Sequence, residues 1–250
     1  MCGRFTLTAS PRLVEEAFGL FAGLPGALPP RYNIAPTQTV LALRQVDADV
    51  PPAYCTLRWG LVPSWAEEIS IGNRLLNARA EGIAEKPSFR SAFKRRRCLI
   101  LADGFYEWQA PAPSAPKKTP KQPFHMHRPD RRPFAFAALW EQWLKGERPL
   151  ETCTIITTSA NDMMRPLHDR MPVILEPPDF ERWLNPAPQD PAGLLELLRP
   201  CANELLTADK VSTVVNNARN ETPACLNGPN EVLAERDLVG QKKDECRNSQ

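Results

Sequence analysis

The hydrophobic pattern of the chain consists of short apolar runs separated by prolines and polar turns. Alternating or continuous apolar positions predict strands at 39–46, 54–63, 98–109, 124–129, 133–143, 151–161, 171–176 and 209–217. Helical spacing predicts helices at 10–21, in the second half of 73–97, at 177–185 and at 191–200. Strands outnumber helices and show no regular βαβ alternation, so the pattern favours an α+β fold. We expect a mainly antiparallel or mixed β-sheet that curls into a barrel-like core, with short peripheral helices.

The first predicted helix has recognisable start signals. Ser10 can accept a hydrogen bond from the first turn, and Pro11 suits the first helical position. The apolar residues from Leu13 to Phe21 fall on one stripe, which predicts that one face of this helix packs on the core.

Proline is over-represented, with 27 of 250 residues, about twice the usual share of roughly 5%. A chain with so many breaks does not form a bundle of long helices. Its length suits a single domain, which we place at residues 2–220. We expect a flexible proline-rich loop at about 110–123 and a polar, loose tail at 221–250. The formal net charge is +2, so nucleic-acid binding would depend on local basic patches.

The cysteines indicate a reducing compartment. There are seven, an odd number, no two have C-x-x-C spacing, and no signal-peptide pattern is present. We therefore expect free thiols in a cytoplasmic protein, associated with the nucleoid if bacterial. Zinc-ligand spacings and apolar runs of membrane-spanning length are missing from the sequence. We expect a monomer with no metal, no cofactor and no membrane partner.

Cys2 is the first candidate for chemistry, because it directly follows the initiator methionine. Removal of Met1 would leave a free α-amine beside a thiol, and this pair can trap an aldehyde as a Schiff base and then as a thiazolidine. An α-amine has a pKa of about 7.8 against about 10.4 for lysine, so far more of it is neutral and nucleophilic at neutral pH. The alternative is that Cys2 is merely a small residue that permits methionine removal.

Glu107 lies in the most apolar predicted strand, 98–109. Period-two alternation places Phe105 and Glu107 on one face and Tyr106 and Trp108 on the other. A carboxylate buried in such a strand needs a partner or a raised pKa, which makes Glu107 a candidate general acid or base. The alternatives are an edge position and a structural ion pair with an arginine.

Two further polar residues are candidates for the same site. His168 lies in a loop between Pro166 and Pro172 that leads into a strand, where catalytic groups are often found, although a lone loop histidine is often uninvolved. Asn77 offers an amide that can hold a terminal amine or an aldehyde oxygen, or else cap a helix.

Basic residues concentrate between Arg74 and Arg97, and tryptophans 59, 65 and 108 flank this region. Arginines interleaved with aromatic residues suit single-stranded nucleic acid, because they supply phosphate contacts and stacking platforms. The alternative for the run KRRR at 94–97 is a solvated helix face.

Six short motifs occur in a fixed order along most of the chain, from residue 2 to about 220: MCGRF, RYNIAP, WGLVPSW, NARAE, ADGFYEW and HDRMPVIL. Together they resemble the SRAP domain family, which comprises SOS-response-associated peptidases and abasic-site-processing proteins. The sequence departs from some relatives close to Pro87, where they have a basic residue. Lys86 and Arg90 are the nearest basic residues here.

The resemblance implies a sensor of abasic sites in single-stranded DNA, including junctions with duplex, that shields the site as a covalent DNA–protein crosslink. It implies a self-processing peptidase that removes Met1, after which Cys2 forms the thiazolidine, with Asn77, Glu107 and His168 as the other catalytic residues. A Schiff base without thiol closure would instead give DNA lyase activity. The implied DNA contacts are Arg4, Asn33, Pro36, Trp65, Arg79 and Arg170.

Two other functions remain open from the sequence. An N-terminal-nucleophile amidotransferase also begins Met-Cys-Gly, but the Asn-Gly pair of this chain, Asn227–Gly228, lies near the C-terminus. A non-catalytic single-stranded nucleic-acid binder would make Cys2 incidental. Glutamine hydrolysis identifies the first, and full activity of Cys2→Ala on abasic DNA identifies the second.

Overall fold

The computed structural model describes residues 2–19, 21–114, 116 and 118–229. The strands are β1 (Phe5–Leu7), β2 (Arg31–Ile34), β3 (Thr39–Arg44), β4 (Ala53–Trp59), β5 (Asn77–Arg79), β6 (Arg97–Ala102), β7 (Gly104–Gln109), β8 (Gln122–His127), β9 (Phe134–Trp143), β10 (Leu150–Ser159), β11 (Arg170–Pro172), β12 (Ile174–Leu175) and β13 (Thr207–Lys210). The α-helices are α1 (Pro11–Phe18), α2 (Arg90–Arg95), α3 (Pro177–Leu184) and α4 (Pro191–Leu195). Short 3₁₀ turns are η1 (Ile69–Arg74), η2 (Asn203–Leu205), η3 (Thr213–Asn216) and η4 (Pro223–Cys225).

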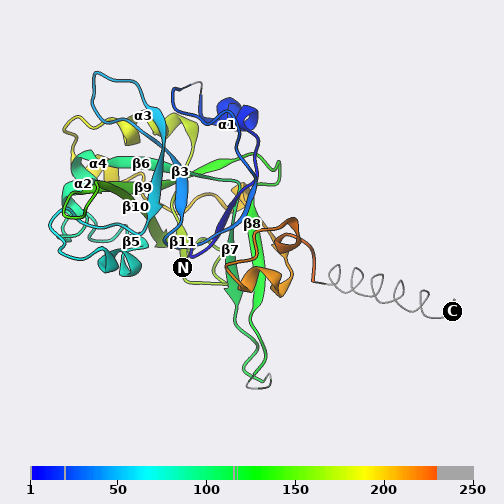
Figure 1. The fold of residues 1–250 in the computed structure, drawn as a ribbon. Helices are drawn as coiled ribbons and strands as arrows, with labels where there is room; N and C mark the ends of the chain where they lie inside the picture. The colour runs from blue at the N-terminus through cyan, green and yellow to red at the C-terminus, as the bar shows by residue number, and fades with distance from the viewer. Residues whose placement is uncertain (1, 20, 115, 117, 230–250) are drawn as a thin grey trace, which may run out of the picture.

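A five-stranded barrel forms the body of the molecule (Figure 1). Strands β10, β4, β3, β6 and β9 pair in this order, and β9 pairs again with β10, which closes the ring. The β10–β4 pair is parallel and the other pairs are antiparallel. The small residues Ala135, Ala137 and Ala138 of β9 are fully buried in the same hydrophobic core as the rings of Phe5 and Phe105, which both contact Phe136 edge-on. The predicted α+β fold with a mixed, barrel-like sheet is therefore confirmed.

Strand β10 extends beyond the barrel, and its extension pairs with the short strands β5 and β11. Its N-terminal half pairs with β4 and β9, and its C-terminal half pairs with β5 in parallel and with β11 in antiparallel register. The hydrophobic pattern predicts neither β5 nor β2, because both are short and their strand partners lie far away in the sequence.

A second sheet, entirely antiparallel, lies beside the barrel in the order β13-β8-β7-β1-β2. Figure 1 shows the β7–β8 hairpin projecting from the body of the molecule. The proline-rich segment expected at about 110–123 connects these two strands, although β8 already begins at Gln122.

The prediction of one strand at 98–109 is wrong, because the chain turns a corner there. Residues Arg97–Ala102 belong to the barrel and Gly104–Gln109 belong to the second sheet. The corner needs a glycine at position 104, since a Cβ atom there would lie 2.0 Å from Nε2 of the His125 ring.

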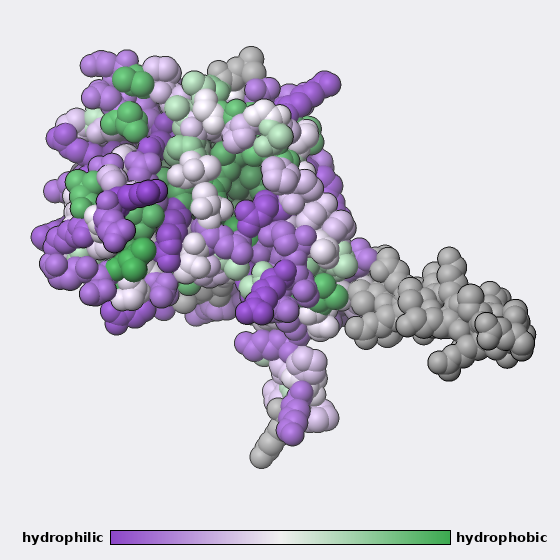
Figure 2. Space-filling model, viewed as in Figure 1, coloured by the Kyte–Doolittle hydropathy of each residue, from purple (hydrophilic) through white to green (hydrophobic). Residues whose placement is uncertain are grey.

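Helix α1 begins where the sequence predicts, with Ser10 accepting a hydrogen bond from the Leu13 N–H (3.4 Å) and Pro11 in the first position. It ends three residues earlier than predicted, because Gly19 leaves helical geometry with φ 107°. Phe18 stacks on Phe180 of α3 at 5.8 Å between ring centroids. Figure 2 shows apolar surface between the positions of α1 and α3, where a groove of about 540 Å³ lies far from the polar residues discussed below.

The C-terminal part of the domain differs from its prediction in two respects. The strand expected at 209–217 ends at Lys210, and Ser212 then starts the 3₁₀ turn η3 by accepting from the Val214 N–H (3.3 Å). The segment 221–229, expected to be part of a loose tail, instead packs on the second sheet with Cys225 fully buried. The rest of the expected tail, 230–250, lies outside the described residues. In the described part of the chain, every helix is too short or too polar to cross a bilayer.

Candidate active site at the N-terminal strand

Strand β1 carries Cys2 into the interior of the protein. It pairs with β7 in antiparallel register with Phe5 opposite Phe105, and continuing this register toward the N-terminus brings Gly3 opposite Glu107. Cys2 has no exposed surface and belongs to the main hydrophobic core. The sequence-predicted nucleophile therefore lies beside the predicted acid or base.

The carboxylate of Asp103 fixes this strand. It accepts hydrogen bonds from the Thr6 hydroxyl (2.5 Å), from the Thr8 hydroxyl (2.7 Å) and backbone N–H, and from the Ala9 N–H (2.9 Å). A buried carboxylate with this many donors is well satisfied. Asp103 thus holds the C-terminal end of β1 and, through it, the register that places Cys2.

Glu107 lies on the face that the alternation predicts. Phe105 joins the main core, while Tyr106 and Trp108 pack in a separate cluster on the opposite face of β7. Strand β7 lies between β8 and β1, so Glu107 is not at a sheet edge. Its side chain is buried.

The thiol of Cys2 is held in its neutral form. Burial raises the pKa of this thiol well above its ordinary value, and the negative charge of Glu107 raises it further. The two side chains are therefore near enough to influence one another. A protonated thiol is a weak nucleophile, so chemistry at this residue begins more readily from an amine than from sulfur.

Asn77 holds the backbone of Cys2. Its Nδ2 donates to the Cys2 carbonyl oxygen at 2.9 Å, and its Oδ1 is buried with no hydrogen-bond partner among the described residues. Asn77 begins β5, where it pairs with Ile155 of β10, so it is not a helix cap. An unsatisfied buried amide oxygen is costly, and it provides an acceptor for a donor at this position.

His168 lies in the connection between β10 and β11, and its contacts are with its neighbours in sequence. Its Nδ1 is 3.0 Å from the Arg170 backbone N–H and 2.7 Å from the Asp169 carboxylate. The N–H can only donate, so it pairs with an unprotonated Nδ1, whereas the Asp169 contact requires a proton on Nδ1. Both contacts involve the same ring nitrogen, which can serve only one of them at a time.

Arg79 and Arg170 lie on the same face of the sheet at the C-terminal half of β10. Ala78, Ile156 and Met171 point into the core on the opposite face. Because neighbouring residues alternate between faces, Asn77 lies on the same face as the two arginines. The sheet thus places two of the predicted DNA contacts along one surface with Asn77.

Arg170 is held firmly on this surface. Its Nη1 and Nη2 donate to the two carboxylate oxygens of Glu81 at 2.8 and 2.9 Å, and Nη2 also donates to the Thr157 carbonyl oxygen at 2.6 Å. The guanidinium of Arg170 holds the pKa of Glu81 below its usual range. Arg79, in contrast, is exposed.

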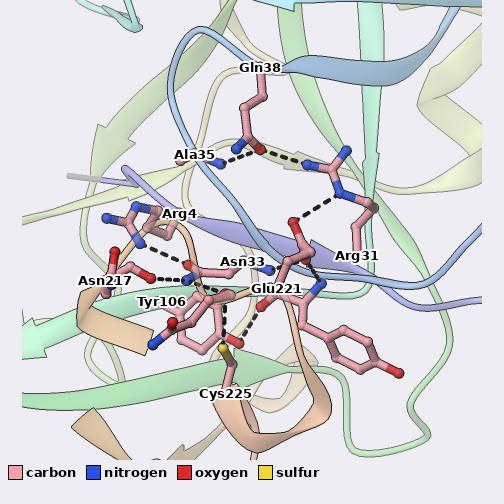
Figure 3. A network of polar contacts seen from close by, with 11 residues as sticks. Arg4, Arg31, Asn33, Ala35, Gln38, Tyr106, Asn217, Glu221 and Cys225 are labelled. Atoms are coloured by element: carbon pink, nitrogen blue, oxygen red, sulfur yellow. Dashed lines mark hydrogen bonds and ion pairs between the residues drawn. The ribbon is translucent and has the colours of Figure 1, made fainter. Parts of the chain in front are cut away.

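Arg4 and Asn33 belong to a polar network on the other side of β1 (Figure 3). Nη1 of Arg4 donates to Asn33 Oδ1 (2.8 Å) and to the Val215 carbonyl oxygen (3.0 Å). The amide of Asn33 donates in turn to the carbonyl oxygens of Val215, Asn217 and Asn220 at 2.9 to 3.2 Å. Asn33 is fully buried, so it positions Arg4 and the C-terminal segment, and any contact with DNA would be made through them.

Glu221 explains why the chain beyond residue 220 is packed. Its carboxylate accepts from the backbone N–H groups of Tyr32 and Asn33 (2.9 Å to the latter) and forms an ion pair with Arg31 at 3.0 Å. Figure 3 shows this carboxylate between β2 and the C-terminal segment. Nothing in the local sequence around Glu221 signals these contacts.

The two remaining predicted DNA contacts lie in loops. Trp65 is 53% exposed, and its carbonyl oxygen accepts from Lys145 (3.1 Å), while the adjacent Ala66 carbonyl accepts from the Trp143 indole (2.7 Å). Pro36 is half-buried in the turn after β2. The Trp65 ring is available for stacking on a loop whose backbone is fixed.

Metal ligands and disulfides do not account for the site. Among the residues that the structure describes, no three His, Cys, Asp or Glu side chains come together in a group that could hold a metal ion. The described cysteines are free thiols, and Cys246 lies outside the described residues.

Sequence reasoning missed four residues that position this site, namely Glu81, Asp103, Thr157 and Glu221. For Asp103 the sequence does carry a signal, since an Asp-Gly pair inside an apolar run favours a turn. The others act through partners distant in sequence.

This arrangement defines a class of protein: a mixed β-barrel with an antiparallel side sheet, in which a buried N-terminal cysteine lies beside an asparagine amide and a glutamate. The chain belongs to the SRAP family, because residues 1–218 match the family profile described as SOS response associated peptidase (SRAP). The resemblance drawn from the six motifs is thereby confirmed.

Similar proteins are found in bacteria and vertebrates. The chain is 43% identical over 228 residues to the abasic site processing protein YoqW of Bacillus subtilis, an alignment that covers 90% of this chain and 99% of YoqW. It is 32% identical over 268 residues to the abasic site processing protein HMCES of Xenopus tropicalis, covering 90% of this chain and 78% of HMCES. The crystal structure of a protein from Bacteroides thetaiotaomicron superimposes with a TM-score of 0.77 at 25% identity, covering 91% of this chain and 99% of that chain.

Proposed function

We propose that this protein processes abasic sites by capturing them in single-stranded DNA as a covalent thiazolidine crosslink at Cys2. The observation that carries the proposal is the contact between Asn77 Nδ2 and the Cys2 carbonyl oxygen, which holds the N-terminal cysteine beside Glu107. Relatives that share most of the chain's length are named for abasic site processing, which supports the same substrate.

The first step is hydrolysis of the Met1–Cys2 peptide bond, which consumes one water and releases methionine. The product carries an α-amine with an ordinary pKa near 7.7 to 8.0, so a useful fraction is neutral at neutral pH. Glu107 is the candidate base for this self-processing, because the register of β1 and β7 places it beside the N-terminal segment and its charge raises the pKa of the Cys2 thiol.

The second step joins the amine to the ring-opened abasic sugar. The amine nitrogen adds to the C1′ aldehyde to give a carbinolamine, which loses water to form a Schiff base. The Cys2 sulfur then adds to the imine carbon while its proton passes to nitrogen, which closes a five-membered ring. The overall change is aldehyde plus aminothiol to thiazolidine plus one water.

Each polar residue has a distinct role in this sequence. Asn77 positions Cys2, and its free Oδ1 accepts a hydrogen bond from the released amine. Glu107 moves protons during amine attack and water loss. His168 has the Arg170 N–H and the Asp169 carboxylate at its Nδ1. In this scheme it donates the proton that opens the sugar ring.

The raised pKa of the Cys2 thiol favours attack by the amine before the sulfur. A neutral thiol leaves the first attack to the amine and then supplies both sulfur and proton for ring closure. If closure fails, the Schiff base can proceed by β-elimination, so DNA lyase activity is the alternative outcome at the same site.

DNA is expected to follow the surfaces that carry the predicted contacts. Arg79 and Arg170 supply charge on the face shared with Asn77, Arg4 supplies it across β1, and Trp65 offers a stacking surface. Pro36 lies in the turn after β2, the strand that carries Asn33, the partner of Arg4. An abasic sugar turned out of a bent single strand, including one at a junction with duplex, fits this arrangement.

The test is intact-mass spectrometry of the protein before and after incubation with a single-stranded abasic oligonucleotide. We expect loss of Met1, then an adduct on the N-terminal peptide that equals the oligonucleotide minus one water and survives a denaturing gel. Retention of Met1 together with full crosslinking would overturn the proposal.

Two variants separate the roles of the amine and the thiol. Cys2→Ser keeps the amine, so it should form an adduct that needs borohydride reduction to survive. Cys55→Ala removes a thiol outside the site and serves as the matched control, with an expected wild-type crosslink. A stable adduct on Cys2→Ala without reduction would exclude ring closure by sulfur.

A further inference from the structure

The guanidinium of Arg170 already holds an anion in the free protein. Both terminal nitrogens donate to the carboxylate of Glu81, in the parallel two-bond arrangement that arginine also uses for a phosphate. The third contact, to the Thr157 carbonyl oxygen, fixes the guanidinium from the side of β10. The position that a DNA phosphate would take is therefore filled by a protein carboxylate.

Solvent reaches this pair from the Glu81 side. The side chain of Arg170 is 12% exposed, while that of Glu81 is 59% exposed. Glu81 thus covers the guanidinium, and an anion arriving from solution meets the carboxylate first. The arginine is held by Thr157 and by the strand pairing of β11, whereas Glu81 lies beyond the end of β5 and is the more exposed partner of the pair.

We propose that Glu81 is a specificity-determining residue that competes with DNA phosphate for Arg170. A phosphate must displace Glu81 to bind, so weakly held, undamaged strands gain little from Arg170. The inference rests on the proposed function, in which Arg170 contacts DNA. Arg79, exposed on the same face, stays available as the first contact for an incoming strand.

The competition predicts a rise in affinity when the carboxylate charge is removed. Glu81→Gln keeps the size of the side chain and frees the charge of Arg170, so we expect about threefold to tenfold tighter binding of undamaged single-stranded DNA. The slope of log affinity against log salt should steepen by roughly 0.7, the value for one additional phosphate contact on a single strand.

The experiment measures fluorescence anisotropy of a labelled, undamaged single-stranded oligonucleotide across a salt series. An undamaged strand has no aldehyde, so binding is separated from crosslinking. The matched control is Glu85→Gln, which makes the same charge change at an exposed residue four positions away. We expect the control to follow the wild type. The double variant Glu81→Gln/Arg170→Gln should lose the gain.

The outcomes distinguish the inference from the proposed function. Equal affinities for Glu81→Gln and Glu85→Gln, or a gain that persists without Arg170, overturn the competition. Weaker binding by Glu81→Gln also overturns it, since Glu81 would then support Arg170 rather than oppose phosphate. If the wild type binds DNA and crosslinks abasic sites in all these cases, the proposed function stands. If it does neither, the proposed function itself is wrong and the inference falls with it.

Discussion

The side chain of Asn77 holds the backbone of the proposed nucleophile, Cys2, before any substrate arrives. Its donor is used on the Cys2 carbonyl, while its acceptor is buried and unused. Native proteins rarely leave such an atom unsatisfied, and when they do the reason is often functional. The orphan oxygen is the kind of feature that a site shows when one of its participants is created later, as the α-amine of Cys2 would be.

Replacing Asn77 with Asp tests this positioning. The change keeps the shape but replaces the donor to the Cys2 carbonyl by an acceptor and adds a negative charge beside Cys2. We expect the crosslinking rate of protein already freed of Met1 to fall about tenfold or more. The variant loses one buried hydrogen bond, and it places an acceptor where the Cys2 carbonyl oxygen needs a donor. Quantified denaturing gels over time measure the rate.

The control for this variant is Asn73→Asp, which makes the same change at an exposed position four residues earlier. It should crosslink at the wild-type rate. Equal rates for Asn77→Asp and the control would show that Asn77 does not position Cys2.

Two partly buried thiols predict a loss of stability at alkaline pH. Burial raises the pKa of Cys55 to about 11 and that of Cys201 to about 12, from an ordinary value of 9.0. A folded thiol that holds its proton more tightly than the unfolded one stabilises the fold fully below pH 9. This contribution is lost as pH rises from 9 toward the folded pKa.

Urea unfolding at pH 8, 9 and 10 under reducing conditions measures this effect. The free energy of unfolding should fall above pH 9, by up to about 1.4 kcal/mol per pH unit for each such group. Cys55→Ala loses a constant packing contribution, so its stability deficit relative to wild type should shrink as pH rises from 9. A deficit that does not change with pH would show that Cys55 titrates equally in both states.

At the scale of elements, the corner between β6 and β7 joins the barrel to the sheet that carries the site. Asp103 binds the end of β1 at this corner, and Gly104 leaves space for the His125 ring, which packs against Tyr106 at 5.0 Å and His127 at 5.4 Å between centroids. Glu107 follows directly on the same strand. The position of Glu107 relative to Cys2 therefore depends on how the chain turns at Asp103 and Gly104.

Gly104→Ala tests the corner. The added Cβ would lie 2.0 Å from Nε2 of His125, a ring that is buried between its neighbours, so the strands must separate or the ring must move. We expect a loss of about 1–3 kcal/mol in the free energy of unfolding, measured in urea. Gly26→Ala is the control, because a Cβ at position 26 meets nothing within 4 Å. Equal stabilities of the two variants would contradict the packing described here.

At the scale of the whole molecule, the sequence predicts what local patterns encode. Alternation identified the strands of the barrel and the faces of Phe105 and Tyr106, and six short motifs identified the family. It did not predict the corner at Gly104. The glycine is needed there because the His125 ring, on strand β8, fills the space that a side chain would take. It also missed β5, the strand that carries Asn77. Three residues are too few to show an alternation of apolar and polar positions, and the partner strand β10 lies far away in the sequence.

The contacts of Glu221 are the plainest case of a feature that local patterns do not encode. Its carboxylate meets the Tyr32 N–H across 189 positions of sequence, and the residues around it are polar enough to resemble a loose tail. Strand β2 and Glu221 come together only in the folded protein. The boundary between domain and tail therefore had to come from the structure.

Two truncations on either side of residues 221–229 test this boundary and should differ in stability. A chain ending at Pro229 keeps the contacts described here and should unfold in urea like the full chain. A chain ending at Asn220 loses the charged acceptor for the N–H groups of Tyr32 and Asn33 and the buried Cys225, so we expect it to be less stable by about 2–4 kcal/mol. Its amides at Tyr32 and Asn33 should also exchange hydrogen faster. If residue 220 were the true end of the packed domain, as the sequence pattern suggests, both truncated chains would match the full chain in stability and exchange.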